Sequence, residues 1–199
     1  MRIEVRADNT ARITGYVNAV ERESRPVITA RGRVNELIES GVFNRALAGG
    51  RDIPMTVDHN PERVAAATGN GTLKLEEDNI GLRADAVTSD EAVIAAAKAG
   101  RIKGWSFGMM HIEDSLEERA DKLPLRRIKG MVLDHVTLVI DKTPCYSATS
   151  VELRADAEED IETRACEGEI KISVEETRAE IDYSAYEARL KELKGENAE

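Results

Sequence analysis

The residues with the clearest capacity for chemistry are the chain's histidines, His59, His111 and His135, and a serine set between glycines. Histidine often serves as a general base near neutral pH because its free pKa is about 6.5. Ser106 stands in the sequence Gly104-Trp105-Ser106-Phe107-Gly108. A serine hydroxyl becomes a useful nucleophile only beside a base, and the base needs a partner that orients it. These residue types therefore indicate covalent catalysis by serine.

The Gly-x-Ser-x-Gly pattern resembles the nucleophile elbow of α/β-hydrolases. In that fold the serine precedes the acid and the histidine, so His135 would have to be the base. The interval between Ser106 and His135 lacks the strand–helix units that the fold requires, and a His59-before-Ser106 order favours another architecture. Two alternatives remain for the Gly-x-Ser-x-Gly sequence. One is an esterase that works independently of His59, and the other is an ordinary strand that contains glycines.

The elements around His59 and Ser106 follow from local signals. Residues 53–57 form a short apolar strand, and Pro61 disfavours helix at the preceding residue, so His59 lies in a turn. A capping box at residues 88–91 begins a helix that Gly100 ends. A strand over 102–110 then carries Ser106, and a charged connection is expected over 113–127.

Residues 131–140 give the most regular strand pattern of the chain. One face of this strand is predicted to hold Met131, Leu133, His135, Thr137 and Val139. Because adjacent strand residues point to opposite faces, only one of Asp134 and His135 is expected to reach His59.

Further strands are predicted at 13–20 and in a hairpin of 69–75 with 81–87, and two short helical turns broken by Gly41 at 35–47. Many short strands with few helices predict an α+β fold. The expected architecture is a mostly antiparallel β-barrel with peripheral helices.

Charge divides the chain into two expected parts. Residues 155–199 carry 15 acidic and 6 basic side chains, against 38 and 28 in the whole chain, whose net charge is -10. We therefore predict a domain over 1–154 and an acidic, partly helical or flexible tail over 155–199, with a terminal helix from Tyr183. Nothing resembles the basic footprint of a nucleic-acid-binding protein.

No metal or cofactor is predicted. Cys145 and Cys166 show neither a CxxC pattern nor metal-ligand spacing. The sequence also shows no signal peptide and no apolar run of membrane-spanning length, so we expect a soluble protein with free thiols in a reducing cytoplasm.

Three blocks in order make the chain resemble the caudovirus (tailed-phage) prohead proteases, which are similar in fold and mechanism to the herpesvirus maturation proteases. The blocks lie within residues 42–82, 100–109 and 133–148, and the resemblance covers roughly residues 13–154. It implies that His59 is the base and Ser106 the nucleophile. The orienting residue is a histidine in the herpesvirus enzymes, which His135 matches, and an acid in many phage relatives, which leaves Asp134 open.

The resemblance also implies a setting. The enzyme would be an endopeptidase that cuts the scaffold protein, or the scaffolding arm of the coat protein, and itself, within the prohead in the host cytoplasm. It would need no cofactor and would act as a homo-oligomer without nucleic acid or membrane. The backbone of 141–143 is a candidate for the oxyanion donors, although this region lacks the arginine pair of the herpesvirus enzymes. The change in charge after Arg154 motivates the hypothesis that the tail is a removable or docking segment, with a solvating segment as the alternative. The alternative is an inactive scaffolding or assembly protein on the same fold.

Overall fold

The computed structural model describes residues 1–140, 161–165 and 174–176. The helices are α1 (Val42–Ala48) and α2 (Glu91–Lys98). The strands are β1 (Arg2–Val5), β2 (Ala11–Ala19), β3 (Val27–Thr29), β4 (Gly32–Ile38), β5 (Pro54–Val57), β6 (Asn60–Ala67), β7 (Leu73–Glu77), β8 (Gly81–Thr88), β9 (Gly104–Glu117), β10 (Leu125–Val139), β11 (Glu162–Ala165) and β12 (Val174–Glu176).

One sheet has the strand order β12-β1-β2-β8-β7. Its neighbours pair antiparallel except for β12, which runs parallel to β1. Along β8, Leu82, Ala84 and Ala86 are buried, so every second side chain enters the core, as the period of a strand requires. The predicted strand at 13–20 and the predicted hairpin of 69–75 with 81–87 are confirmed in β2, β7 and β8.

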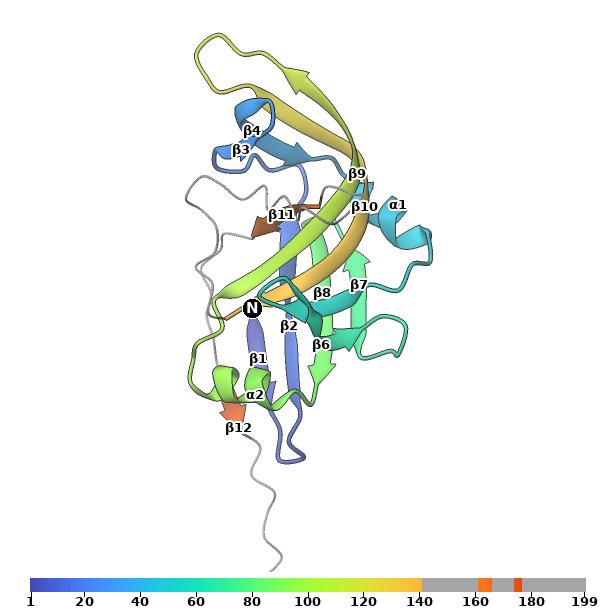
Figure 1. The fold of residues 1–199 in the computed structure, drawn as a ribbon, viewed down its shortest axis with the longest axis vertical. Helices are drawn as coiled ribbons and strands as arrows, with labels where there is room; N and C mark the ends of the chain where they lie inside the picture. Colours follow the sequence, from blue (N-terminus) through green and yellow to red (C-terminus); the bar gives the residue numbers. More distant parts are fainter. Residues whose placement is uncertain (141–160, 166–173, 177–199) are drawn as a thin grey trace, which may run out of the picture.

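The second sheet is built on β9 and β10, two long antiparallel strands that cross the molecule in Figure 1. The first residues of β10 pair with β4 and its last residues pair with β5, both in parallel. On the other side, β9 pairs antiparallel with β11. Strands β5, β10, β9 and β11 therefore lie side by side where the candidate site is found.

The predicted β-rich architecture with few helices is confirmed, whereas the barrel is not. Among the described residues, the strand pairings form two open sheets and do not close into a ring. The long strand β10 has different neighbours at its two ends, so it bridges β4 and β5 instead of continuing one regular sheet.

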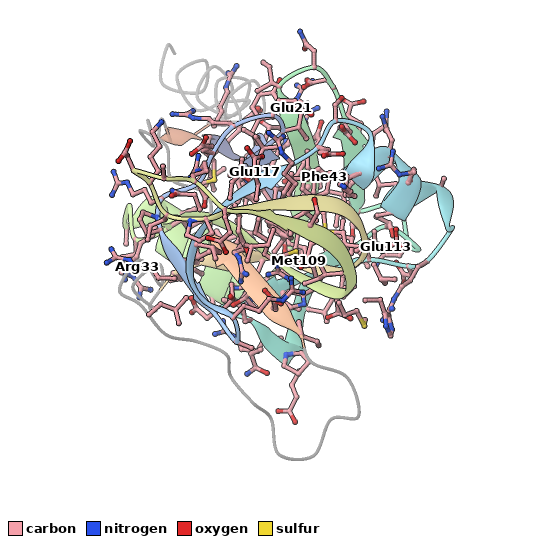
Figure 2. All side chains as sticks on the ribbon, turned by 90° about the horizontal axis from the view of Figure 1, so that it is seen from above. Glu21, Arg33, Phe43, Met109, Glu113 and Glu117 are labelled. Atoms are coloured by element: carbon pink, nitrogen blue, oxygen red, sulfur yellow. The ribbon has the colours of Figure 1, made fainter. Side chains whose placement is uncertain are left out.

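The core is aliphatic with a small aromatic centre. Phe43 on α1 and Phe107 on β9 meet edge to face with ring centroids 5.6 Å apart, and both are fully buried. In Figure 2 the labelled Phe43 and Met109 belong to this interior, whereas the labelled Arg33 and Glu117 are exposed. Phe107 thus fixes the strand that carries Ser106 from the side opposite to the serine.

Three local predictions were wrong. Residues 32–38 form strand β4 instead of a helical turn, because β4 pairs with β3 and β10 and buries Val34 and Ile38. The expected connection over 113–127 is shorter and covers only 118–124, because β9 extends to Glu117 and β10 begins at Leu125, and these two residues pair. Helix α2 is capped by Asp90, whose carboxylate accepts a hydrogen bond from the Val93 N–H at 2.8 Å, and not by a box that starts at Thr88.

The predicted domain boundary at residue 154 and the terminal helix from Tyr183 lie outside the described residues. Within the part of the chain that is described, no helix is long and apolar enough to cross a membrane.

Candidate active site

His59 sits in a two-residue turn that joins β5 to β6. Asp58 and His59 have φ values of 52° and 57°, the left-handed pair that a type I′ hairpin turn requires. The Ile140 N–H donates to Asp58 Oδ1 at 2.8 Å, and the His59 N–H donates to Thr137 Oγ1 at 3.1 Å. These two bonds tie the turn to the end of β10 and hold the imidazole over that strand.

Ser106 and His135 share a face of the sheet because of the β9–β10 register. Ser106 is opposite Thr137, and Gly108 is opposite His135. Directly opposed residues project to the same side of an antiparallel pair, so His135 and Ser106 both lie beneath His59. Leu133, predicted on the same face as His135, lies on the opposite face.

That prediction was wrong because the pairing contains a bulge at Asp134. Leu133 pairs with Met109 and His135 pairs with the next residue, Gly108, so Asp134 is the extra residue on β10. A bulge interrupts the alternation of side chains and re-aims them locally. The bulge also lets the adjacent side chains of Asp134 and His135 contact each other. The Asp134 carboxylate lies 2.7 Å from Nδ1 of the His135 ring.

The side chains form one hydrogen-bonded chain. His59 Nε2 lies 2.9 Å from Ser106 Oγ, and His59 Nδ1 lies 2.8 Å from His135 Nε2. The two rings are nearly perpendicular, with centroids 5.1 Å apart. The structure thus brings together His59, Ser106 and His135, whereas His111 is exposed on β9.

The proton positions along this series of hydrogen bonds can be assigned by starting from Asp134. A hydrogen bond from His135 holds the pKa of Asp134 below its usual range, against the opposing effect of burial and with help from Arg51. An ionised carboxylate only accepts, so His135 Nδ1 must donate to it. In neutral rings, His135 Nε2 then accepts from His59 Nδ1–H, which leaves His59 Nε2 bare to accept from the serine hydroxyl. This is the tautomer that a general base requires.

A strand of the chain itself covers the serine. In β11, Ala165 pairs with Ser106 and Arg164 pairs with Phe107. The carbonyl oxygen of Arg164 is 2.7 Å from Ser106 Oγ, and Ser106 is only 1% exposed. The hydroxyl has a single hydrogen, so donating it to Arg164 competes with donating it to His59.

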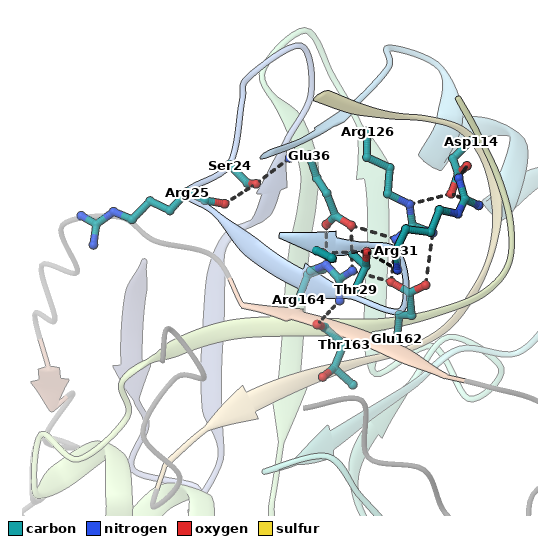
Figure 3. A network of polar contacts seen from close by, with 11 residues as sticks. Ser24, Arg25, Thr29, Arg31, Glu36, Asp114, Arg126, Glu162, Thr163 and Arg164 are labelled. Atoms are coloured by element: carbon teal, nitrogen blue, oxygen red, sulfur yellow. Dashed lines mark hydrogen bonds and ion pairs between the residues drawn. The ribbon is translucent and has the colours of Figure 1, made fainter. Parts of the chain in front are cut away.

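Next to this strand lies a cluster of charged side chains that sequence reasoning missed (Figure 3). Glu36 from β4 and Arg126 from β10 are both buried and pair at 2.9 Å, and Arg126 also pairs with Asp114. Arg164 and Glu162 from β11 complete the cluster. Its members come from four separate strands, β4, β9, β10 and β11, so no local sequence pattern predicts the cluster.

Two other expectations concern the oxyanion donors and metal binding. The candidate oxyanion donors at 141–143 lie outside the described residues. Within the described ranges, no three His, Cys, Asp or Glu side chains are grouped so that they could hold a metal ion.

A serine hydroxyl hydrogen-bonded to a histidine that a second group orients is the arrangement of serine hydrolases. Comparison with known families gives a match over residues 1–164 to the family described as caudovirus prohead serine protease. The chain belongs to this family of serine peptidases, as the three sequence blocks predicted. No curated protein and no solved structure matches the chain.

Proposed function

We propose that this protein is a serine endopeptidase of capsid maturation in which Ser106 is the nucleophile, His59 the general base and His135 the residue that orients the base. The observation that carries the proposal is the continuous chain from Ser106 Oγ through both rings, with links of 2.9 and 2.8 Å. Such distances lie within the hydrogen-bond reach that proton transfer needs.

The reaction is acyl transfer to serine. His59 Nε2 takes the hydroxyl proton as Ser106 Oγ bonds to the peptide carbonyl carbon, and His59 then gives that proton to the leaving amine. A water molecule, deprotonated by the same ring, hydrolyses the ester. His135 accepts the hydrogen bond from His59 Nδ1 and so stabilises the imidazolium that forms.

Asp134 extends this arrangement and reconciles the two candidates for the orienting residue. Its carboxylate lies 2.7 Å from His135 Nδ1, on the far side of that ring from His59. We assign His135 to orient the base directly and Asp134 to hold His135.

The substrates are proposed from membership of the family, whose description names the prohead. We expect cleavage of the coat protein's scaffolding arm or of the scaffold protein, inside the assembling particle in the host cytoplasm, and cleavage of the protease itself. Self-association and a removable or docking tail over 155–199 remain parts of this proposal.

An inactive assembly protein on the same fold is the second candidate, favoured by the cover that β11 places over Ser106. Co-expression with the phage coat and scaffold proteins distinguishes the two, comparing wild type with Ser106→Ala by gel and intact mass. Processing that disappears in Ser106→Ala supports the protease. Processing that is unchanged, or absent from both, contradicts it.

A further inference from the structure

Strand β11 occupies the position in which a peptide substrate would meet the proposed nucleophile. It runs antiparallel to β9, the strand of Ser106, and brings the carbonyl group of Arg164 to the serine hydroxyl. An extended peptide that adds a strand to a sheet edge takes its affinity from backbone hydrogen bonds and its specificity from pockets for alternate side chains. The contacts of the Glu162 and Arg164 side chains therefore indicate which side chains this sheet edge would bind in a peptide.

The side chain of Arg164 enters a site made for a guanidinium group. Its Nη2 donates to Glu36 Oε1 at 2.8 Å, and its Nε donates to the other carboxylate oxygen of Glu36. Glu36 is only 5% exposed and belongs to β4, so the acceptor is supplied by the folded body of the protein. A planar two-point contact of this kind distinguishes arginine from lysine and from neutral side chains.

Glu162 enters a complementary basic site. Its carboxylate accepts from Arg126 at 2.7 and 3.1 Å. Arg126 is itself held by Glu36 and Asp114, so both subsites share one ion-pair network. Burial acts to lower the pKa of Arg126, but the hydrogen bonds that it donates to Glu162 and Asp114 raise this pKa, which keeps the guanidinium charged.

The spacing of the two side chains follows from strand geometry. Glu162 and Arg164 are two residues apart and face the same side, toward the network, as Figure 3 shows. Thr163 between them contributes its carbonyl oxygen to Arg164. The recognised segment is therefore an acid, any residue and an arginine, followed by the residue beyond the bond that faces Ser106.

The same tetrapeptide, Glu-x-Arg-Ala, recurs in the sequence near β11. It stands at 162–165 in β11 itself and again at 152–155 and 176–179. We propose that the edge of β9, with Glu36 and Arg126, is a peptide site for Glu-x-Arg-Ala segments and that the Arg-Ala bond is the bond cut. This inference rests on the proposed function and names its substrate class.

The cleavage step balances without any co-reactant except water. The Ser106 Oγ forms an ester with the arginine carbonyl carbon, and the bond to the alanine nitrogen breaks. The serine proton passes through His59 to that nitrogen, which leaves as the new amino terminus. Water then splits the ester into the arginine carboxylate and the free hydroxyl.

Two further copies, at 4–7 and 117–120, serve as internal controls. The copy at 4–7 begins in β1, which is paired on both sides. In the copy at 117–120, Arg119 donates to Leu123 O at 2.8 Å and pairs with Glu23. Because these contacts hold both segments within the folded structure, they cannot bind at the edge of β9. We therefore expect no cleavage after Arg6 or Arg119 in the folded chain.

The test uses the full-length wild-type chain and a synthetic peptide with the sequence of residues 172–181. A second peptide carries citrulline, which has the shape of arginine without its charge, at the position of Arg178. We expect cleavage after the arginine, and kcat/KM at least about 30-fold lower for citrulline, because the buried Glu36 then keeps Arg126 but loses its second charged partner. Glu36→Gln should reduce the ratio of kcat/KM between the arginine and citrulline peptides. Glu118→Gln, at an exposed site, should leave that ratio unchanged.

Two further readouts separate this inference from the proposed function. The first is labelling of Ser106 by a fluorophosphonate. Labelling together with equal cutting of both peptides, or cutting elsewhere, overturns the peptide site and leaves the protease intact. The second is binding of both peptides to Ser106→Ala, which needs no catalysis. Weaker binding of the citrulline peptide supports the site even if labelling and cleavage both fail, and equal binding overturns it.

Discussion

The ring of His135 lies directly over Gly108, its cross-strand neighbour, in space that no other residue would leave free. A Cβ at position 108 would be 2.4 Å from Cε1 of that ring, far inside van der Waals contact. The second glycine of the Gly-x-Ser-x-Gly sequence therefore makes room for His135. It does not mark the sharp strand-to-helix elbow of α/β-hydrolases, because β9 continues as a strand to Glu117.

Replacing this glycine should damage catalysis. In Gly108→Ala the His135 ring must move, so His59 loses its partner, and a displacement of this kind costs on the order of 100-fold in kcat. Peptidase assays on the purified variant measure the effect. Gly49→Ala is the matched control, because a Cβ there meets only Ala46 O at 3.5 Å. Equal rates for Gly108→Ala and wild type would refute the role given to His135.

Removal of the His135 ring nitrogens should be more harmful still. His135→Phe keeps an aromatic ring over Gly108 but offers His59 Nδ1 no acceptor, so the proper tautomer of the base is no longer favoured. We expect kcat to fall by about 100- to 10,000-fold with a small change in KM. His111→Phe, at an exposed site on the same strand as Ser106, should behave like wild type. A large rise in KM with kcat preserved would assign His135 to substrate binding instead.

The lowered pKa of Asp134 predicts a stability change with pH. Its hydrogen bond to His135 is the main cause, opposed by burial and assisted by Arg51. A carboxyl whose folded pKa is depressed stabilises the fold above its unfolded pKa of about 3.9, and this stabilisation is lost as the pH falls through the folded value. Asp134→Asn should lower the free energy of unfolding at pH 7 and leave it nearly unchanged at the acid end.

Urea unfolding of both proteins between pH 2.5 and 7 checks that expectation. The difference between wild type and Asp134→Asn should grow as the pH rises through the acid range and then level off. A difference that is constant across the range would mean that the pKa of Asp134 is the same in the folded and unfolded chains.

Replacing the buried Arg126 should strongly lower the free energy of unfolding. It is buried and donates to Glu36, Asp114 and Glu162, so Arg126→Met removes one of the two arginines that each of these carboxylates contacts. Breaking a buried ion pair from one side costs about 3–5 kcal/mol of unfolding free energy. Its neighbour Arg127 is half-exposed and pairs with Glu117, and Arg127→Met should cost less than about 1 kcal/mol. Denaturant titration compares the two variants, and similar losses would contradict the assigned network.

The sequence predicted those features that depend on local pattern or on motif order. The turn at His59, the strand of Ser106 and the β7–β8 hairpin all follow from nearby residues, and the order of the blocks pointed to the family that the comparison confirms. What it missed depends on pairing over long distances. The bulge at Asp134 reverses the expected faces of β10, and the strand identity of residues 32–38 is fixed by β3 and β10.

The recurrence of Glu-x-Arg-Ala shows the same limit. The repeated residues are visible in the printed sequence, but they have no chemical meaning until β11 is seen against Ser106 and Glu36. Glu36 lies 128 positions from Arg164 in the chain, so only the folded sheet brings the pair together.

The central claim is that His59 activates Ser106, and site-directed labelling with a fluorophosphonate tests it most directly. Intact mass and peptide sequencing would locate and time the label in wild type, in His59→Ala and in Arg164→Ala, whose lost contact with Glu36 loosens the cover over the serine. We predict a single label on Ser106, faster in Arg164→Ala and lost in His59→Ala. A label on another residue, or labelling of Ser106 at the same rate without His59, would contradict the account.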